Sequence, residues 1–219
     1  MLNWRLFCKM LKKLVIIIGL CPFFSFAQKY GGKRSKDISA SGGYTYVNIN
    51  GNGYIGYNLF GKYFFRIRPN LSFGLGVKYI SVSENETKQI NSINVTLNNK
   101  FDSLLAGFDL AYKINTRSII YQINPYVYYG LFNSWQQSNK FSNGATSITG
   151  SPKISTNILY GVGFSAFIRT KRFYTGPTFY YSYGYLATQS YSDSSGATHL
   201  SASGFYSAYD INLTFGFYL

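Results

Sequence analysis

His199 and Ser201 are the two side chains in this sequence whose types and spacing could perform nucleophilic catalysis. His199 is the only histidine among the 219 residues. In an extended strand, residues two apart share a face, so its imidazole and the Ser201 hydroxyl lie on one side. A base that activates a serine also needs an acid to orient it. The next acid, Asp210, lies nine residues after Ser201 and deeper in the expected strand. We therefore interpret His199 as a solvated histidine.

A second group of side chains carries charge at alternating positions. Its members fall in rows of small or polar residues that alternate with apolar ones: Lys62, Arg66, Lys78, Asp109, Lys113 and Asp210. Counting from the neighbouring turns, we predict that Lys78 and Asp109 lie at similar heights on adjacent strands and form an ion pair. These charges could line a selective channel or form a structural network in a narrow interior. We favour the network, because eight strands leave room mainly for side chains.

Other site chemistry is missing from the sequence. There is no phosphate-binding glycine loop, no paired-carboxylate site and no metal-ligand spacing. Cys8 and Cys21 are the only cysteines, and both lie in the first 27 residues, so the remaining chain can form no disulfide and no thiolate metal site. We predict no catalytic residue, no metal and no cofactor.

The first 27 residues have the pattern of a secretory signal peptide. Arg5, Lys9, Lys12 and Lys13 precede an interrupted apolar run that ends in Ser25-Phe26-Ala27. We expect cleavage between Ala27 and Gln28, followed by a basic periplasmic segment over 28–37. The alternatives are an uncleaved anchor and a lipoprotein attached through Cys21, and the latter is disfavoured because Leu20 stands where a small residue is needed.

Composition separates the exported chain from most soluble classes. Charged residues make up 13% of the sequence and aromatic residues 20%. Once the signal is removed, the formal net charge is roughly +10. A basic, aromatic chain could bind nucleic acid. However, export removes it from cytoplasmic nucleic acid, and its aromatics alternate along strands instead of lining one groove. We predict no nucleic-acid partner.

The end of the chain has a two-residue period. One face carries Ile211, Leu213, Phe215, Phe217 and Leu219, and the other carries Asn212, Thr214 and Gly216. This alternation is typical of a strand with lipid on one face and a polar interior on the other. Similar rows predict eight strands at 38–49, 54–67, 71–79, 103–114, 119–131, 157–168, 173–185 and 201–219.

Two features of these strands need particular attention. In the first strand, Tyr44 and Tyr46 favour one register, whereas Val47 and Ile49 favour the other. Pro125 and Pro177 each lack a backbone donor, and we expect a local bulge at each.

Connection lengths set the predicted topology. Short turns at 68–70, 115–118 and 169–172 alternate with connections at 50–53, 81–100, 133–153 and 187–200, three of which are long and polar. Outer-membrane barrels combine short periplasmic turns, long extracellular loops and an even strand number. We predict an all-β, eight-stranded antiparallel up-and-down transmembrane β-barrel over 38–219 with both termini periplasmic. The alternative is an exported lipocalin-like barrel, but aromatic rows of this size would overfill its interior.

On these features, residues 38–219 resemble the small outer-membrane β-barrels of Gram-negative bacteria, the OmpA-barrel and OmpX-like group. The last strand resembles the strand that closes such barrels. The resemblance implies residence in the outer membrane, contact with its lipid and lipopolysaccharide, and assembly through the last strand by the barrel-assembly machinery. His199-Leu200-Ser201 also resembles a fragment of the His-x-Ser arrangement in outer-membrane lipid A deacylases.

Three functions from different classes follow. The first is a structural or surface-interaction protein that acts through its extracellular loops and has no wide pore. The second is an accessory barrel of a secretion or envelope-assembly machine, which would co-purify with large envelope proteins. The third is a lipid A hydrolase that uses His199 and Ser201, in which His199→Ala would change the acyl pattern of lipid A. A wide diffusion porin is disfavoured because it needs roughly sixteen strands.

Overall fold

A computed structural model describes residues 36–49, 51–90, 93–141 and 147–219. Over these ranges the chain forms eleven β-strands and no helix, so no helix is long and apolar enough to cross a membrane. The expected signal peptide, its cleavage site between Ala27 and Gln28, and residues 28–35 of the basic segment lie outside the described residues. The strands are β1 (Lys36–Ile49), β2 (Asn52–Arg68), β3 (Leu71–Ile90), β4 (Ile93–Asn115), β5 (Ile119–Phe141), β6 (Ile148–Gly150), β7 (Ile154–Arg169), β8 (Phe173–Thr188), β9 (Tyr191–Ser192), β10 (Thr198–His199) and β11 (Ser203–Tyr218).

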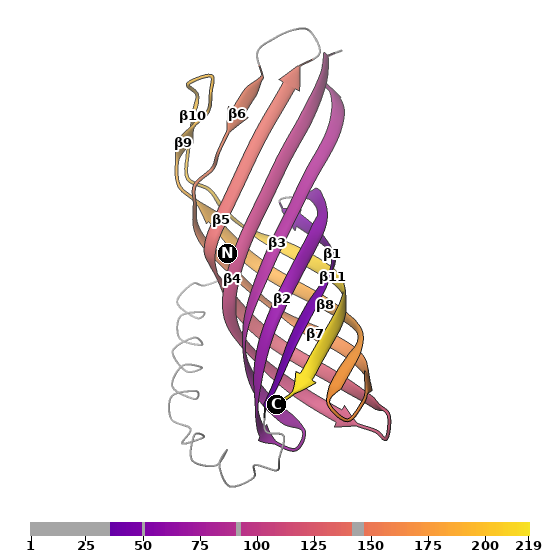
Figure 1. Ribbon diagram of the computed structural model, residues 1–219. Helices are drawn as coiled ribbons and strands as arrows, with labels where there is room; N and C mark the ends of the chain where they lie inside the picture. The colour runs from indigo at the N-terminus through magenta and orange to yellow at the C-terminus, as the bar shows by residue number, and fades with distance from the viewer. Residues whose placement is uncertain (1–35, 50, 91–92, 142–146) are drawn as a thin grey trace.

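Eight of these strands close into a ring (Figure 1). Sequential neighbours pair antiparallel in the order β1, β2, β3, β4, β5, β7, β8 and β11, and β11 pairs back with β1. At the seam, Phe215 lies opposite Ala40 on one side and Thr175 on the other. The predicted eight-stranded antiparallel barrel is confirmed.

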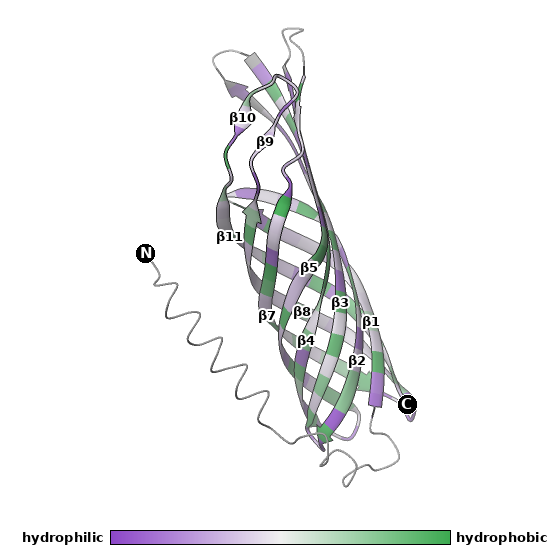
Figure 2. Ribbon diagram, turned by 90° about the vertical axis from the view of Figure 1, so that its left-hand side faces the viewer, coloured by the Kyte–Doolittle hydropathy of each residue, from purple (hydrophilic) through white to green (hydrophobic). Residues whose placement is uncertain are grey.

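The two-residue period separates the outer wall from the interior, and Figure 2 shows the resulting bands of apolar residues along the strands. In β11, the apolar row of Ile211, Leu213, Phe215 and Phe217 is exposed, as is Leu219 just after the strand, whereas Thr214 and Asn212 are buried. In β1, Tyr44 and Tyr46 point outward while Val47 and Ile49 point inward. One register therefore satisfies both pairs, because Val47 and Ile49 enter an apolar part of the interior.

Two predicted loops are in fact extensions of strands. β3 and β4 continue through most of 81–100 and pair from Glu84 with Asn99 out to Ile90 with Ile93. β5 likewise continues through 133–141. Loops were predicted here because residues 81–100 and 133–153 are mostly polar. These extensions of β3, β4 and β5 stand above the barrel wall (Figure 1), where no lipid-facing row is needed. The backbone ladder between the strands nevertheless continues.

Pro125 and Pro177 interrupt strand pairing without forming the predicted bulges. Pairing of β4 with β5 keeps one register on either side of Pro125, but it lapses between Tyr126 and Ile123. Pairing of β7 with β8 lapses in the same way beside Pro177. Neither site is a bulge, so that prediction was wrong. A missing N–H removes hydrogen bonds to one neighbour without inserting a residue.

The interior is more apolar than the sequence rows suggested. Toward the long-loop end, buried aromatic and aliphatic side chains form one cluster that includes Tyr54, Phe60, Ile80, Tyr128, Leu159 and Tyr206. A smaller cluster of Ile120, Phe167 and Tyr174 lies toward the short turns. The interior is therefore a packed core in which apolar clusters lie beside buried polar side chains.

Candidate functional site

Lys78 is buried in the interior beside Asp210. Its Nζ lies 2.7 Å from Asp210 Oδ2. The second carboxylate oxygen accepts from Asn58 Nδ2 at 3.3 Å, and Asn212 in turn donates to Asn58 Oδ1 at 2.6 Å. β2, β3 and β11 thus meet at one polar cluster, and its charge is balanced within the cluster.

Lys62 makes the second interior ion pair, with Asp109. Lys62 Nζ donates to Asp109 Oδ1 at 2.6 Å, and Asn124 Nδ2 donates to the same oxygen at 2.9 Å. The Tyr128 hydroxyl donates to the other oxygen. A buried carboxylate with three donors is well satisfied.

The predicted pairing of Lys78 with Asp109 was wrong. In the β3–β4 ladder, Asp109 lies opposite Gly74, whereas Lys78 lies opposite Leu105. The two charged residues are thus four residues apart in height. Counting from the turns ignored this stagger. It also considered only adjacent strands, although long side chains inside a narrow barrel reach strands farther round the ring.

Lys62 and Lys78 both lie over aromatic rings in the middle of the barrel. Lys62 Nζ is 4.9 Å from the centre of the Phe60 ring and 4.8 Å from that of Tyr180, and Lys78 Nζ is 4.6 Å from that of Phe60. Phe60 and Tyr180 stack with their centres 4.6 Å apart. Ammonium groups are attracted to the faces of such rings. This aromatic plug, made of Phe60, Tyr180 and the two lysines, fills the middle of the barrel.

Lys113 forms a third buried ion pair near the short turns, with Asp37. Lys113 Nζ lies 2.7 Å from Asp37 Oδ2, and the Tyr174 hydroxyl donates to Oδ1 at 2.8 Å. The sequence reasoning placed Asp37 in the basic segment before the barrel, but β1 begins at Lys36. The alternation of Asp37, Ser39 and Ser41 with Ile38 and Ala40 was the signal that could have extended this strand.

These interior charges have the form of a structural network. Lys62, Lys78 and Lys113 each have one carboxylate partner, and all six charged groups are buried. No group of three or more His, Cys, Asp or Glu side chains in the described part of the chain could hold a metal ion. A charge that is paired and hydrogen-bonded in this way fixes neighbouring strands but offers no free nucleophile or base.

His199 lies at the long-loop end, in the hairpin of β9 and β10. Its Nε2 is 2.9 Å from Asp193 Oδ2, and its ring stacks on Tyr191 with centres 4.7 Å apart. Sequence reasoning considered Asp210 as the orienting acid and missed Asp193, which precedes the left-handed Gly196 of the turn. The Ser201 side chain forms no hydrogen bond with His199 or with any other described residue. The geometry therefore does not join these residues into a catalytic set.

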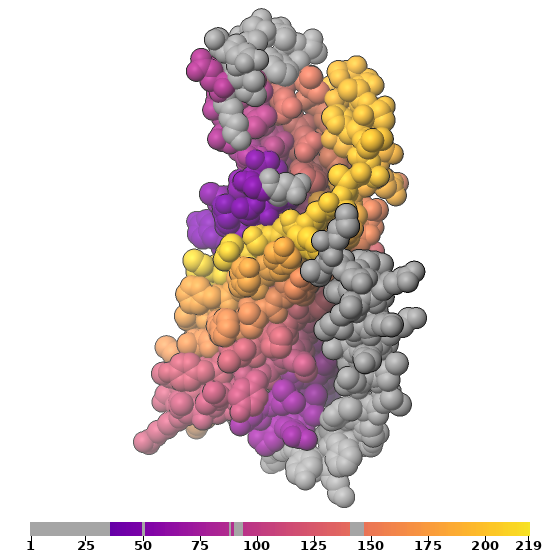
Figure 3. Space-filling view, turned by 180° about the vertical axis from the view of Figure 1, so that it is seen from behind, coloured from indigo at the N-terminus to yellow at the C-terminus, as the bar shows by residue number. Residues whose placement is uncertain are grey.

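The long-loop end carries a projecting ribbon, here called the outer sheet, made of residues 84–90 of β3, 93–99 of β4 and 137–141 of β5. One edge, on β5, is covered. β6 pairs with residues 137–139, and Tyr191 of the β9–β10 hairpin donates to Gln137 Oε1 at 3.0 Å. The space-filling view shows the segment between β8 and β11 standing beside this sheet (Figure 3).

The other edge of the outer sheet, on β3, is open. β2 pairs with β3 only as far as Ser83, and over the described residues no strand pairs with the far side of β3 beyond that point. In the described part of the chain, the outer side of β3 beyond Ser83 therefore has no paired strand. Such an edge can accept another strand.

Comparisons with known proteins give structural similarity only. Protein-family models and curated proteins yield no match. Among solved structures, the chain is similar to Neisserial surface protein A (11% identity, 84% of this chain and 97% of that one, TM-score 0.44). It is also similar to Ail of Yersinia pestis (17%, 85% and 99%, 0.41) and to the outer membrane protein OprG of Pseudomonas aeruginosa (12%, 85% and 98%, 0.45). At these identities the likeness concerns the fold, which the strand pairing establishes independently.

Proposed function

We propose that the chain is an integral outer-membrane β-barrel that binds external polypeptides through the open β3 edge of its outer sheet. Membrane residence is supported by the outer wall. Large apolar side chains such as Ile55, Leu59, Phe108, Leu213 and Phe215 are all about half exposed or more. A soluble protein rarely exposes a continuous apolar patch larger than a few hundred Å². If the wall contacts lipid hydrocarbon instead of water, exposure of these side chains carries no free-energy cost.

The interior supports a role other than diffusion. The aromatic plug and the three ion pairs occupy the space that a pore would need. Bound molecules therefore meet the protein at its ends and not along its axis. At the long-loop end, the outer sheet is the largest element that leaves the wall (Figure 1).

The open β3 edge is the single observation that carries the binding proposal. The β5 edge is shielded by β6 and the β9–β10 hairpin, whereas no strand of the described residues pairs with the β3 edge beyond Ser83. Its exposed side chains are polar, as in Asn85, Thr87 and Gln89. Polar side chains limit non-specific edge-to-edge association while the backbone still offers a ladder. An extended peptide would add as a further strand, held chiefly by main-chain hydrogen bonds.

A peptide selection tests this edge directly. A random peptide library is panned against the wild-type barrel in nanodiscs, and clones are counter-screened on a variant in which residues 84–99 are replaced by a short turn. The matched control replaces residues 190–200, which removes the β9–β10 hairpin instead. We expect selected peptides to need residues 84–99, to slow amide exchange over Glu84–Gln89, and to lose binding when alternate backbone nitrogens are methylated. Equal binding to both truncated barrels would refute the proposal.

A further inference from the structure

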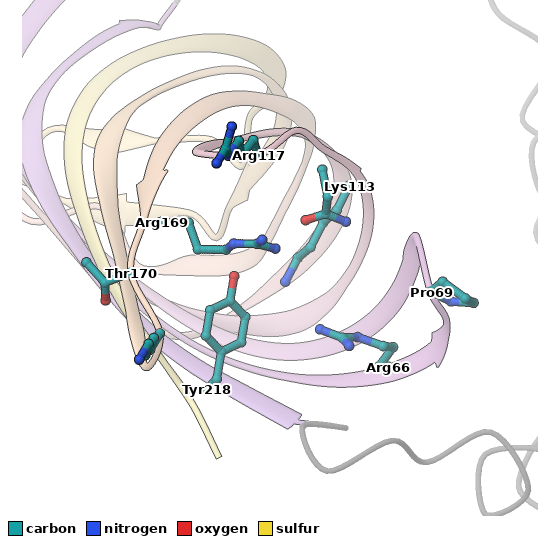
Figure 4. Close-up of a pocket in the computed structure, with 9 residues that line it drawn as sticks. Arg66, Pro69, Lys113, Arg117, Arg169, Thr170 and Tyr218 are labelled. Carbon is teal, nitrogen blue, oxygen red and sulfur yellow. The ribbon is translucent and has the colours of Figure 1, made fainter.

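The short-turn end of the barrel contains a pocket with an unusual charge. Its volume is about 630 Å³, and its basic lining residues come from the ends of three hairpins: Arg66, Lys113, Arg117, Arg169 and Lys171. Tyr218 of β11 completes the wall. In Figure 4, Arg66 and Arg169 reach across the mouth from different strands toward Lys113 and Tyr218. This set of residues is here called the basic pocket.

Most of the positive charge in the basic pocket has no acidic side chain nearby. The chain has only seven acidic residues, and Asp37 is the one near this end. Asp37 is already engaged by Lys113 and Tyr174. The other six lie in the middle of the barrel or at the long-loop end: Glu84, Glu86, Asp102, Asp109, Asp193 and Asp210. Arg66, Arg117 and Arg169 form no ion pair with any described residue.

Hydrogen bonds within and between the short turns hold the rim that carries these cations. In two turns a threonine hydroxyl accepts the amide three residues on, Thr116 from Ile119 and Thr170 from Phe173, each at 3.1 Å. The residue after each threonine is basic: Arg117 in the first turn and Lys171 in the second. Arg169 N–H donates to Ser118 C=O at 2.9 Å, which joins the two turns. The cations are thus presented on a pre-organised frame.

Like charges gathered in a concave space repel one another and attract a multivalent anion. Arginine suits phosphate in particular, because its planar fork donates two parallel hydrogen bonds to phosphate oxygens. We propose that the basic pocket binds a phosphate-bearing ligand, either the headgroup of an anionic phospholipid or a soluble phosphate compound. This goes beyond the peptide-binding role, which concerns the opposite end of the barrel.

The first test uses inorganic pyrophosphate and the full chain folded in a phosphate-free detergent. Isothermal titration compares wild type with the double variant Arg117→Gln/Arg169→Gln, against a KCl titration of equal ionic strength. The matched control is Lys140→Gln/Lys153→Gln, which removes two exposed charges remote from the basic pocket. We expect the first double variant to bind at least about tenfold more weakly, and the control to match wild type. This titration needs no membrane, so its outcome is independent of the proposed location.

The second test distinguishes the source of the phosphate. The same proteins are placed in phosphatidylcholine nanodiscs with or without phosphatidylglycerol, and native mass spectrometry counts the lipids that stay bound. Retained phosphatidylglycerol that is lost in Arg117→Gln/Arg169→Gln identifies a lipid headgroup. Pyrophosphate binding without lipid retention identifies a soluble ligand. If neither probe binds wild type above its control, or if the double variant binds both probes as wild type does, the proposal is wrong.

Discussion

Lys78 and Asp210 join β3 to β11 through the interior of the barrel. Lys78 Nζ lies 2.7 Å from Asp210 Oδ2, and neither side chain is exposed. The residues are 132 positions apart in the sequence. Their strands are not neighbours in the ring, because β1 and β2 lie between them. A buried charge must have its partner, so this pair ties the last strand to the first half of the barrel.

Removing one member of this pair should be strongly destabilising. Asp210→Ala leaves a buried ammonium without its carboxylate, and we expect a loss of about 3–5 kcal/mol in the free energy of unfolding. Lys78→Met combined with Asp210→Ala should cost less than the sum of the single changes. Urea titration of the barrel refolded in lipid vesicles measures all three values.

The pair of Lys100 and Asp102, in which only the lysine is exposed, provides the control for that cycle. Its N–O distance is 3.1 Å, and the Lys100 side chain is 54% exposed. Solvent screens such a pair, so Asp102→Ala should change stability much less than Asp210→Ala. Additive losses for the Lys78 and Asp210 changes would show that the two residues do not act as a pair.

The aromatic plug should control both stability and permeation. Phe60→Ala removes the ring that stacks on Tyr180 and faces both lysines, and we expect a cost of about 3–5 kcal/mol. Phe60→Leu keeps most of the volume but loses the ring, so it should cost less and isolate the attraction to the cations. In planar bilayers, wild type should give no steady conductance and Phe60→Ala should leak. A steady wild-type current would contradict a filled interior.

The barrel itself could be predicted because apolar residues alternate with small or polar residues along most of its strands. The two-residue period in β11 defines its outward row without further information. The same reasoning failed where that contrast ends. Residues 84–90 and 93–99 stand above the barrel wall (Figure 1), and their mostly polar side chains hid strands whose pairing is seen in the backbone ladder.

Partners inside the barrel could not be predicted from the sequence. The alternation identifies Lys62, Lys78 and Asp109 as inward residues, but the stagger between strands decides which of them meet. Asp193 was missed for a different reason. It binds His199 through a local turn at Gly196, and turn geometry is not visible in strand periodicity.

The hairpin of β9 and β10 should lose order only at very low pH. Hydrogen bonds from Ser195, and then from His199, lower the pKa of Asp193 from 3.8 to about 2. A carboxyl group with a lowered pKa stabilises the folded form above its unfolded pKa, and this contribution disappears as pH falls through about 2. The protection factors of the amides in residues 191–199, in which the pH dependence of the intrinsic exchange rate is divided out, should therefore be high at pH 5 and low near pH 2.

Asp193→Asn gives the matched variant for the hairpin. The amide keeps the size of the side chain but removes the titration, so the protection factors should no longer change between pH 5 and pH 2. The remainder of the barrel serves as an internal reference within each sample. A pH step that persists in Asp193→Asn would assign it to another group.

The last strand offers a direct test of the lipid-facing wall. Phe215 is 54% exposed on the outer face and lies between Ala40 and Thr175. An arginine on the lipid face near mid-membrane should cost about 2–4 kcal/mol, and less toward the interfaces. Phe217 is close to the short-turn rim, so Phe215→Arg should impair folding and insertion more than Phe217→Arg.

Thr214 supplies the inward control in the same strand. Its hydroxyl is buried 2.8 Å from that of Thr178, so an arginine there would overfill the interior whatever surrounds the barrel. Thr214→Ser keeps the hydroxyl and should fold as wild type does. Heat-modifiable gel mobility, which distinguishes the folded barrel from the unfolded chain, reports each variant. If Phe215→Arg folds as well as wild type, or if wild type stays dispersed without detergent, the outer wall does not face hydrocarbon. The gradient from Phe215 to Phe217 is the decisive comparison, because simple loss of a phenyl ring would affect both positions alike.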